Sequence, residues 1–517
     1  MNLRPSSCAA ALCAIAVAHS AGAAEPKFQD ADTRAWWRLT AQLSDDSMEG
    51  RDTGSPAYAR AAKIVADRFA AAGLKPAGDN GSFFQSVPLH EVRIDAAGAR
   101  IAVARDGGAP VELRFLHQVT VRPTDELPET LDAPLVFRGY CSAAEMGEVR
   151  GKVVVCFGTR RNGLPSAADR VRAASAGGAA GLINVDDLGF TIEPPRWPVA
   201  YARSVSLRDA PPPPAAALPV MSLSADAFPA VIAGSGRDAA KILADGAAKR
   251  PLPSFDIPAR LQARFPTVKA DYASDNVLAL LPGTDPKLAK EVVVISAHLD
   301  GYGYGEPVGG ERIYHGTYDD AAYVATLVRF AERHHGAGLR RTVLLAAFTG
   351  EEKGLLGSTW FTRHPTVPRD ELAADINLDQ LRPLFPLKIL TVEGLGETTL
   401  GETARTVANG MGVEVRPDLE PERNLVRRAD HWPFMQIGVP AVGFVFGYDP
   451  GTEAESRYRD WYTVRYHRPQ DSLATPIDPK AAADFNRFFY TLTEAVADAP
   501  ERPAWLPTAT LGPVAAK

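Results

Sequence analysis

The chain has 517 residues, of which 46% are hydrophobic and 23% are charged. This composition is typical of a globular protein and excludes disordered and coiled-coil chains, and the length predicts two or three domains. With 56 basic and 62 acidic residues the net charge is -6, so the chain lacks the basic excess of nucleic-acid-binding proteins and we expect no nucleic-acid partner.

The first residues have the pattern of a secretory signal peptide. A short basic start precedes an apolar run over residues 8–18, and the small residues that follow predict cleavage near Ala23 or Ala24. The run is too short to cross a bilayer, and no later stretch is long and apolar enough to do so. We therefore expect a signal peptide over residues 1–24 and an exported protein, periplasmic or extracellular, without a membrane span.

Two cysteines, Cys141 and Cys156, remain after this predicted cleavage. An oxidising compartment permits a disulfide between them if their Cβ atoms face each other. Both residues also suit a role as small buried hydrophobic side chains in neighbouring strands. The sequence leaves these alternatives open.

Residues 56–73 predict an amphipathic helix. The segment starts with Pro56, carries Ile64 and Phe69 at helical spacing, and ends at Gly73, a residue typical of helix C-caps. We assign this helix to the N-terminal part of the main domain, residues 25–130.

Residues 131–255 differ from the flanking segments in their sequence pattern and predict a separate insert. Short β-rich runs, APLVFRGY and GKVVVCFG, precede an alanine-rich helical stretch and the strand AGLINV, and prolines follow at 211–214. This order resembles a protease-associated domain, whose copies in related enzymes lie near the mouth of the active site. A spacer that does not contact substrate is the alternative.

From residue 256 to 500, hydrophobic strands alternate with helical stretches, as in VVVISAHL, TVLLAAFTG and AADINLD. Such alternation predicts an α/β domain built on a mostly parallel, doubly wound sheet with helices on both faces. Residues 501–517 predict a tail with little regular structure.

Polar residues with metal-binding chemistry follow these predicted strands. His298 and Asp300 come where the first strand ends, the edge at which open α/β sheets place ligands. Residues two apart on a strand share a face, so Asp300 can accept a hydrogen bond from the imidazole nitrogen that His298 does not offer to a metal.

Two further acidic pairs lie near the same edge. Asp319 and Asp320 precede a predicted helix, where an acid caps free N–H groups or bridges two cations. Glu351 and Glu352 follow the second strand as adjacent carboxylates. Their mutual repulsion is relieved if both face solvent or if cations are bound between them.

Asp379 follows a third strand, and His467 lies in a late loop. Each residue is unremarkable alone, but the set contains two histidines and three carboxylates, if one glutamate of the pair ligates and its neighbour stays off the metal as a base. Such donors suit a pair of zinc ions.

The order H-x-D, G-x-x-D-D-A, T-G-E-E-x-G-L-L-G-S, N-L-D and Y-H-x-P-x-D resembles the co-catalytic di-zinc peptidase family that contains bacterial leucyl aminopeptidases and glutamate carboxypeptidase II. The resemblance implies two Zn²⁺ per chain. One ion would be held by His298, Asp319 and Asp379, and the other by Asp319, Glu352 and His467.

The same resemblance assigns further roles. Glu351 would be the general base, Asp300 would orient His298, and Tyr466 would donate a hydrogen bond to the substrate carbonyl. The chain departs from the family where Tyr323 replaces a small residue and where Gln380, not methionine, follows Asp379.

The predicted activity is that of an aminopeptidase on peptide substrates, because a site rich in carboxylates attracts the substrate ammonium group. Residues 297–304 and 349–358 contain no arginine, whereas arginines would favour a carboxypeptidase; Arg423, Arg427 and Arg428 keep that alternative open. A glutaminyl cyclase and a non-catalytic protein of transferrin-receptor type are further alternatives, and retention of all five ligands argues against both. The preferred side chain and the oligomeric state are not predicted.

Overall fold

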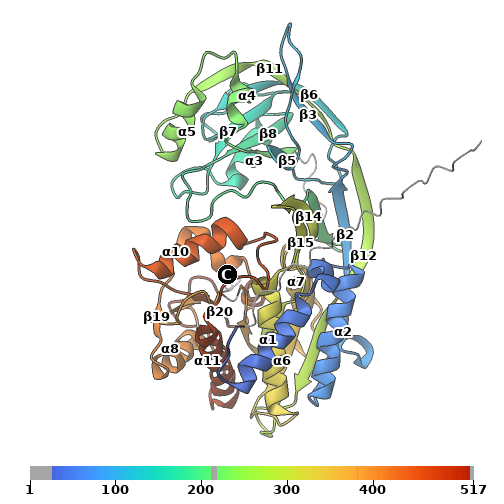
Figure 1. Cartoon of the computed structure of the whole chain (residues 1–517), viewed down its shortest axis with the longest axis vertical. Helices are drawn as coiled ribbons and strands as arrows, with labels where there is room; N and C mark the ends of the chain where they lie inside the picture. The colour runs from blue at the N-terminus through green and yellow to red at the C-terminus, as the bar shows by residue number, and fades with distance from the viewer. Residues whose placement is uncertain (1–25, 211–217, 381, 513–517) are drawn as a thin grey trace, which may run out of the picture.

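The computed structural model describes residues 26–210, 218–380 and 382–512, which form two lobes (Figure 1). The lower lobe contains both ends of the described chain, and the upper lobe is built from its first half. The predicted signal peptide lies outside the described residues. Among the described residues, none of the helices combines the length and the apolar character needed to cross a bilayer.

Within the described residues, the lower lobe is organised around a ten-stranded sheet. Its strands follow the order β19-β18-β20-β17-β13-β16-β12-β2-β9, with β1 paired to β12. The strands are β1 (Lys75–Pro76), β2 (Phe84–Ile94), β9 (Arg203–Leu207), β12 (Thr267–Leu281), β13 (Val292–His298), β16 (Thr342–Phe348), β17 (Leu372–Asn377), β18 (Ile389–Glu393), β19 (Glu414–Arg416) and β20 (Ala441–Phe446).

The centre of this sheet is parallel. Strand β13 pairs in parallel with β16 and β17, and β17 pairs in parallel with β20. Antiparallel pairs flank this centre, because β12 runs opposite to β16 and β2, and β18 runs opposite to β20. The predicted α/β fold is confirmed, and the sheet as a whole is mixed.

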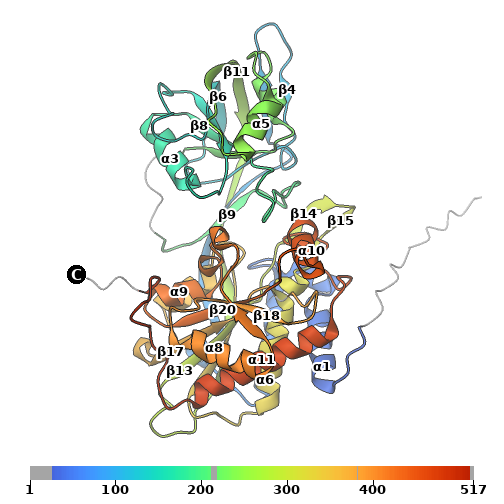
Figure 2. The same ribbon diagram turned by 90° about the vertical axis from the view of Figure 1, so that its left-hand side faces the viewer.

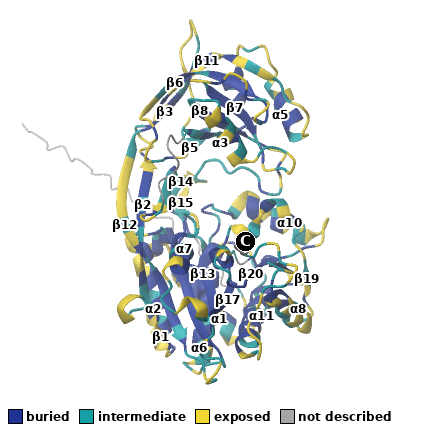
Figure 3. Cartoon of the chain, turned by 180° about the vertical axis from the view of Figure 1, so that it is seen from behind, coloured by how far each residue is buried: buried dark blue, intermediate teal, exposed yellow. Residues whose placement is uncertain are grey.

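Helices cover both faces of the sheet (Figure 1, Figure 2). Successive residues of a strand point to opposite faces, so Val293 and Ile295 of β13 pack on one helical layer and Val292 and Val294 on the other. All are buried, as are the central strands generally (Figure 3). The first layer consists of α1 (Ala31–Leu43), α2 (Pro56–Ala71), α6 (Ala322–His334), α8 (Thr399–Gly410) and α11 (Pro479–Asp498), and the second contains α7 (Leu356–Arg363) and α9 (His431–Gln436).

The helix predicted over residues 56–73 is confirmed as α2. Ser55 caps it by accepting a 3.0 Å hydrogen bond from the main-chain N–H of Tyr58, which satisfies one of the free donors of the first turn. Val65 and Phe69 form part of its buried face, so the apolar spacing read from the sequence is the face that packs on the sheet.

An eight-stranded sheet forms the upper lobe in the described chain, in the order β4-β3-β11-β6-β7-β8-β10-β5. It draws on residues 100–264, a wider range than the predicted insert, whose boundaries at 131 and 255 stay predictions. The elements are β3 (Arg100–Ala104), β4 (Val111–Glu112), β5 (Val119–Val121), β6 (Thr130–Arg138), β7 (Val153–Gly158), α3 (Ala167–Ala176), β8 (Gly181–Asp186), β10 (Val220–Leu223), α4 (Phe228–Ile232), α5 (Ala239–Ala247) and β11 (Ser254–Arg264).

A disulfide joins Cys141 to Cys156 within this upper lobe. Both residues are fully buried and pack in an apolar cluster with Val154 and Leu182. The bond therefore staples the turn after β6 to strand β7.

Chain connections tie the lobes together. The chain enters the upper lobe after β2 and returns from β11 into β12. Strands β2 and β12 pair along their length in the lower sheet. Strand β9 also pairs with β2. After α11 the chain has no long element, as predicted for residues 501–512, but the Trp505 indole donates a 2.8 Å hydrogen bond to the carbonyl of Gly438.

Candidate active site

The predicted metal ligands come from strand ends on one edge of the lower sheet. His298 is the last residue of β13, while Glu352 and Asp379 lie a few residues past β16 and β17. Because β16 and β17 flank β13 in parallel, these three side chains reach the same edge. Asp319 joins them from the turn before α6, and His467 from the loop after the turn at 461–465.

Asp319 lies at the centre of this cluster. Its Oδ1 is 3.1 Å from Nε2 of His298, and its Oδ2 is 3.4 Å from Nε2 of His467. Glu352 Oε2 lies 3.1 Å from the same His467 nitrogen, and Asp379 Oδ1 lies 3.9 Å from Nε2 of His298. Two groups of three donors share Asp319, and a third group combines His298 with Glu351 and Glu352; the donor atoms of each group lie within 4.8 Å of one another.

The electrostatics of this cluster fit bound cations. Asp319 Oδ2 and Asp379 Oδ1 are buried and have no hydrogen-bond partner among the described residues. Burial, followed by the charge of Asp319, raises the pKa of Asp379 to about 7. A buried carboxylate set of this kind is stable when cations neutralise it, and two imidazoles with three carboxylates match the donors that zinc prefers.

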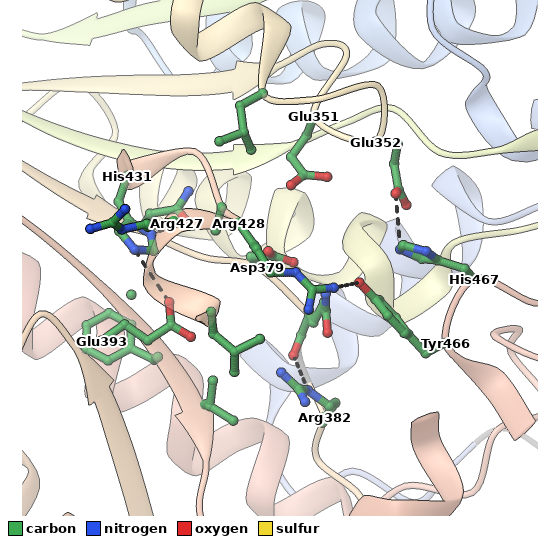
Figure 4. A pocket seen from close by; sticks show the side chains of 18 of the residues that line it. Glu351, Glu352, Asp379, Arg382, Glu393, Arg427, Arg428, His431, Tyr466 and His467 are labelled. Carbon is green, nitrogen blue, oxygen red and sulfur yellow. Dashed lines mark hydrogen bonds and ion pairs between the residues drawn. The ribbon is translucent and has the colours of Figure 1, made fainter. Parts of the chain in front are cut away.

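Glu351 is not a member of the two groups that share Asp319. Its carboxylate points into the pocket, whereas the neighbouring Glu352 faces His467 (Figure 4). Glu351 Oε2 is 3.9 Å from Nε2 of His298, and burial raises the pKa of Glu351 well above its usual value. The two adjacent glutamates therefore have different surroundings, as their predicted roles require.

Asp300 contacts His298 in a different way from the one that the H-x-D spacing predicts. The His298 Nδ1 faces the main-chain carbonyl of Asp300 at 3.1 Å, while the nearer carboxylate oxygen is 3.8 Å away. That carboxylate instead accepts hydrogen bonds from the main-chain N–H of Glu351 at 3.1 Å and from the Thr53 hydroxyl at 2.8 Å. Asp300 thus orients the ring through its main chain and the glutamate loop through its side chain.

Tyr466 lines the pocket beside the metal cluster. Its ring centroid lies 3.7 Å from that of His467, and its phenol oxygen accepts a 3.2 Å hydrogen bond from Arg428 (Figure 4). Burial raises the pKa of Tyr466, so the phenol keeps its proton. Because the oxygen is occupied as an acceptor, the hydroxyl proton is available to another group.

Two residues without a predicted role support the ligands. The Tyr302 hydroxyl lies 2.9 Å from Nδ1 of His467, the nitrogen that does not face Glu352. The Asp471 carboxylate accepts hydrogen bonds from the main-chain N–H groups of Tyr318 and Asp319 at 3.0 and 3.1 Å. The Y-H-x-P-x-D motif contains Asp471 and gave a signal for it, whereas nothing in the sequence marked Tyr302.

A buried arginine holds the loops around the cluster. The Arg51 guanidinium is fully buried and donates hydrogen bonds of 2.7 to 2.8 Å to the carbonyls of Leu43, Leu299, His315 and Gly316. Three of these carbonyls belong to the loops that follow His298 and precede Asp319. His315 itself is buried, with its Nε2 3.0 Å from Oδ1 of Asp46.

The pocket has a volume of about 420 Å³ and contains Glu351, Glu352, Asp379, Tyr466 and His467 among its lining residues. Its far wall is polar, with Nε2 of His431 3.4 Å from Glu393. Burial raises the pKa of Glu393 to about 8 and lowers that of His431 to about 4. At pH 7 this pair is therefore neutral in charge.

Of the three arginines left open by the sequence, Arg427 and Arg428 line the pocket (Figure 4). Arg423 is buried behind it, 3.4 Å from Glu420 and 3.8 Å from Glu193. Positive charge therefore reaches the pocket from a loop distant in sequence from the ligands.

Residues 276–493 match the profile of Peptidase family M28. All five candidate ligands and Glu351 lie within this range. This range is therefore similar to the M28 peptidases, and we call it the M28 domain.

Two curated proteins are similar to the M28 domain. The chain is 25% identical over 214 residues to aminopeptidase YwaD of Bacillus subtilis (strain 168), covering 39% of this chain and 40% of that protein. It is 24% identical over 238 residues to leupeptin-inactivating enzyme 1 of Streptomyces exfoliatus, covering 44% of this chain and 50% of that protein. The matched part spans half or less of the length of these relatives.

Solved structures extend the likeness beyond the M28 domain. An aminopeptidase from Aneurinibacillus sp. strain AM-1 covers 91% of this chain and 95% of its own, with 16% identity and a TM-score of 0.60. The zinc aminopeptidase BSAP from Bacillus subtilis covers 93% of this chain and 97% of its own, with 18% identity and a TM-score of 0.57. The shared fold therefore includes both lobes.

Proposed function

We propose that this chain is a zinc-dependent aminopeptidase that removes N-terminal residues from peptides. The observation that carries the proposal is the pair of donor groups that share Asp319, buried at the strand ends of the M28 domain. The similar proteins, which include a zinc aminopeptidase, support the same function.

In this proposal the chain binds two Zn²⁺. His298, Asp319 and Asp379 would hold one ion, and Asp319, Glu352 and His467 would hold the other. When bound, zinc lowers the pKa of a water molecule and polarises the substrate carbonyl. The unpartnered oxygens of Asp319 and Asp379 support this arrangement.

Glu351 acts as the general base. Its carboxylate lies outside the two donor groups but within the same pocket, so it can take a proton at Oε and later return it to the leaving amine. Burial raises its pKa, and nearby divalent cations would oppose that shift and favour the ionised base. Asp300 holds the main chain of Glu351 in place through the 3.1 Å hydrogen bond.

Tyr466 donates a hydrogen bond to the substrate carbonyl oxygen. The Arg428 guanidinium donates a hydrogen bond to the phenol oxygen of Tyr466, which leaves the Tyr466 hydroxyl proton available to a substrate acceptor. A donor aimed at the site of developing negative charge stabilises the transition state of acyl transfer.

We also propose that the protein is exported and that the upper lobe is a protease-associated insert. The Cys141–Cys156 disulfide supports an oxidising destination. The order of strands and helix in the upper lobe, β6-β7-α3-β8, supports the second assignment.

Metal analysis and turnover together test this function. We expect two zinc equivalents per purified chain, loss of leucine p-nitroanilide hydrolysis on chelation, and recovery on adding zinc. One equivalent after reconstitution would favour a glutaminyl cyclase, and none would favour a binding protein. An acetylated leucyl peptide should not be cleaved. Its cleavage would favour the carboxypeptidase alternative, which Arg427 and Arg428 in the pocket wall keep open.

A further inference from the structure

A second pocket adjoins the candidate active site on the side that faces the upper lobe. It has a volume of about 320 Å³ and shares Tyr302 and His467 with the first pocket. Its other lining residues come from the upper lobe, chiefly from 194–201. The first pocket is lined only by residues of the M28 domain, so a peptide whose first residue lies there would leave through the second pocket.

The upper lobe contributes a buried carboxylate surrounded by arginines. The Glu193 side chain is 1% exposed, accepts hydrogen bonds of 2.7 and 3.1 Å from Arg428, and lies 3.1 Å from Arg160 and 3.6 Å from Arg196. Among the described residues, no other carboxylate lies within 4.0 Å of these three guanidinium groups. One negative charge therefore faces three positive charges.

Other charged groups nearby do not remove this excess. Arg423 also approaches Glu193, but Glu420 lies closer to it. Asp186 lines the second pocket, where its Oδ2 accepts a hydrogen bond from the Trp197 indole. Even if Asp186 is ionised, the three positive charges of the arginines that pair with Glu193 exceed the two negative charges of Glu193 and Asp186.

The positive charge is accessible and close to the candidate catalytic residues. The Arg196 guanidinium carbon lies 4.6 Å from the centroid of the Tyr466 ring, which in turn lies 3.7 Å from that of His467. These contacts place Arg196 within about two to three residues of extended chain, at about 3.4 Å each, from His467. The side chains of Arg160 and Arg196 are 58% and 24% exposed.

We infer that Arg160 and Arg196 in the second pocket, reinforced by the nearby charge of Arg428, form a binding site for a carboxylate located one or two residues after the scissile bond. The inference rests on the proposed aminopeptidase function and names its substrate class, which is short peptides with a free C-terminal carboxylate or an acidic side chain at that position. A substrate carboxylate supplies the missing negative charge, and the fork of a guanidinium group suits two parallel hydrogen bonds to it.

Matched peptides test the site. We expect kcat/KM for Leu-Gly to exceed that for Leu-Gly amide by about tenfold, the effect of one charge-assisted hydrogen bond. Leu-Asp amide distinguishes the two sources of the carboxylate. If it is cleaved as well as Leu-Gly, the site accepts an acidic side chain; if it behaves like Leu-Gly amide, the site requires the C-terminal carboxylate.

Two variants connect this preference to the arginines. Arg160→Gln and Arg196→Gln should each reduce the Leu-Gly to Leu-Gly amide ratio several-fold. The control is Arg172→Gln, since Arg172 lies on α3 of the same lobe, is 71% exposed and pairs with Asp169 of its own helix; its ratio should equal that of the wild type.

A wild-type ratio near one, or a ratio that survives in both variants, would overturn the inference. Failure of the proposed function looks different: leucine p-nitroanilide would resist hydrolysis, or acetyl-Leu-Gly would be cleaved. In that case calorimetry with Glu351→Gln still decides the question, because the carboxylate site predicts tighter binding of Leu-Gly than of its amide and equal affinities contradict it.

Discussion

The main-chain N–H of Glu351 donates a 3.1 Å hydrogen bond to the carboxylate of Asp300. The carboxylate also accepts a hydrogen bond from Thr53, and the main-chain carbonyl of Asp300 faces the His298 ring. Asp300 is fully buried, so water does not compete for these groups. One residue thus positions both the proposed general base and a proposed metal ligand, but through different atoms.

This division predicts the effect of Asp300→Ala. The variant keeps the carbonyl that faces His298 and loses the acceptor for Glu351, so kcat should fall about 10- to 100-fold while zinc content is retained. Asp300→Asn should recover part of the loss because its amide oxygen still accepts from the Glu351 N–H. Loss of metal to the same extent in both variants would contradict a role through Glu351.

The two adjacent glutamates should respond differently to the same substitution. Glu351→Gln should keep both metals and lose turnover by about 10²- to 10⁴-fold, the usual contribution of a general base. Glu352→Gln should lose metal, because Glu352 faces His467 within one donor group. Zinc content and kcat measured on both proteins check this. The reverse pattern would exchange the two roles.

Much of the lower lobe could be predicted because its signals are local. Runs such as VVVISAHL and TVLLAAF are buried on both faces of the sheet, as β13 and β16 are, and the polar residues after them mark the strand ends. The clustering of the candidate ligands was predictable for the same reason, since parallel neighbours bring their carboxyl ends to one edge.

Contacts between the lobes could not be predicted in this way. Glu193 and Arg428 are 235 residues apart in the chain, and no local spacing indicates that they meet. Within the lower lobe, Tyr302 and His467 also meet although no local spacing indicates this contact. The early strands of the upper sheet were also not predicted, because β3, β4 and β5 are short, with five, two and three residues.

Arg51 provides a prediction about stability. Replacing it by Met leaves the carbonyls of Leu43, Leu299, His315 and Gly316 without their buried donor, and unsatisfied buried polar groups are costly. We expect the free energy of unfolding to fall by about 3 kcal/mol or more, measured by chemical denaturation. Arg60→Met is the control, since Arg60 is 47% exposed, and it should change stability by less than about 0.5 kcal/mol. Equal effects would remove the structural role of Arg51.

Asp186 gives the upper lobe a pH-dependent contribution to stability. Burial raises the pKa of Asp186 from 3.8 to about 6, against the opposing effect of Arg160. The folded chain therefore binds more protons than the unfolded chain between about pH 4 and 6, and stability falls as pH rises through this window. Asp186→Asn removes this cost and should raise the free energy of unfolding by about 3 kcal/mol at pH 7 but little at pH 4.

Chemical denaturation between pH 4 and 7 checks this prediction as the difference between variant and wild type. The candidate metal site also titrates in this range. Both proteins contain it, so its effect cancels in the difference between the two unfolding free energies. Asp132→Asn is the control: the hydrogen bond from Arg260 lowers the pKa of Asp132, so its contribution is lost only as pH falls below about 4. Its difference from wild type should therefore stay constant across the window. A constant difference for Asp186→Asn as well would mean that burial does not raise the pKa of the Asp186 carboxyl.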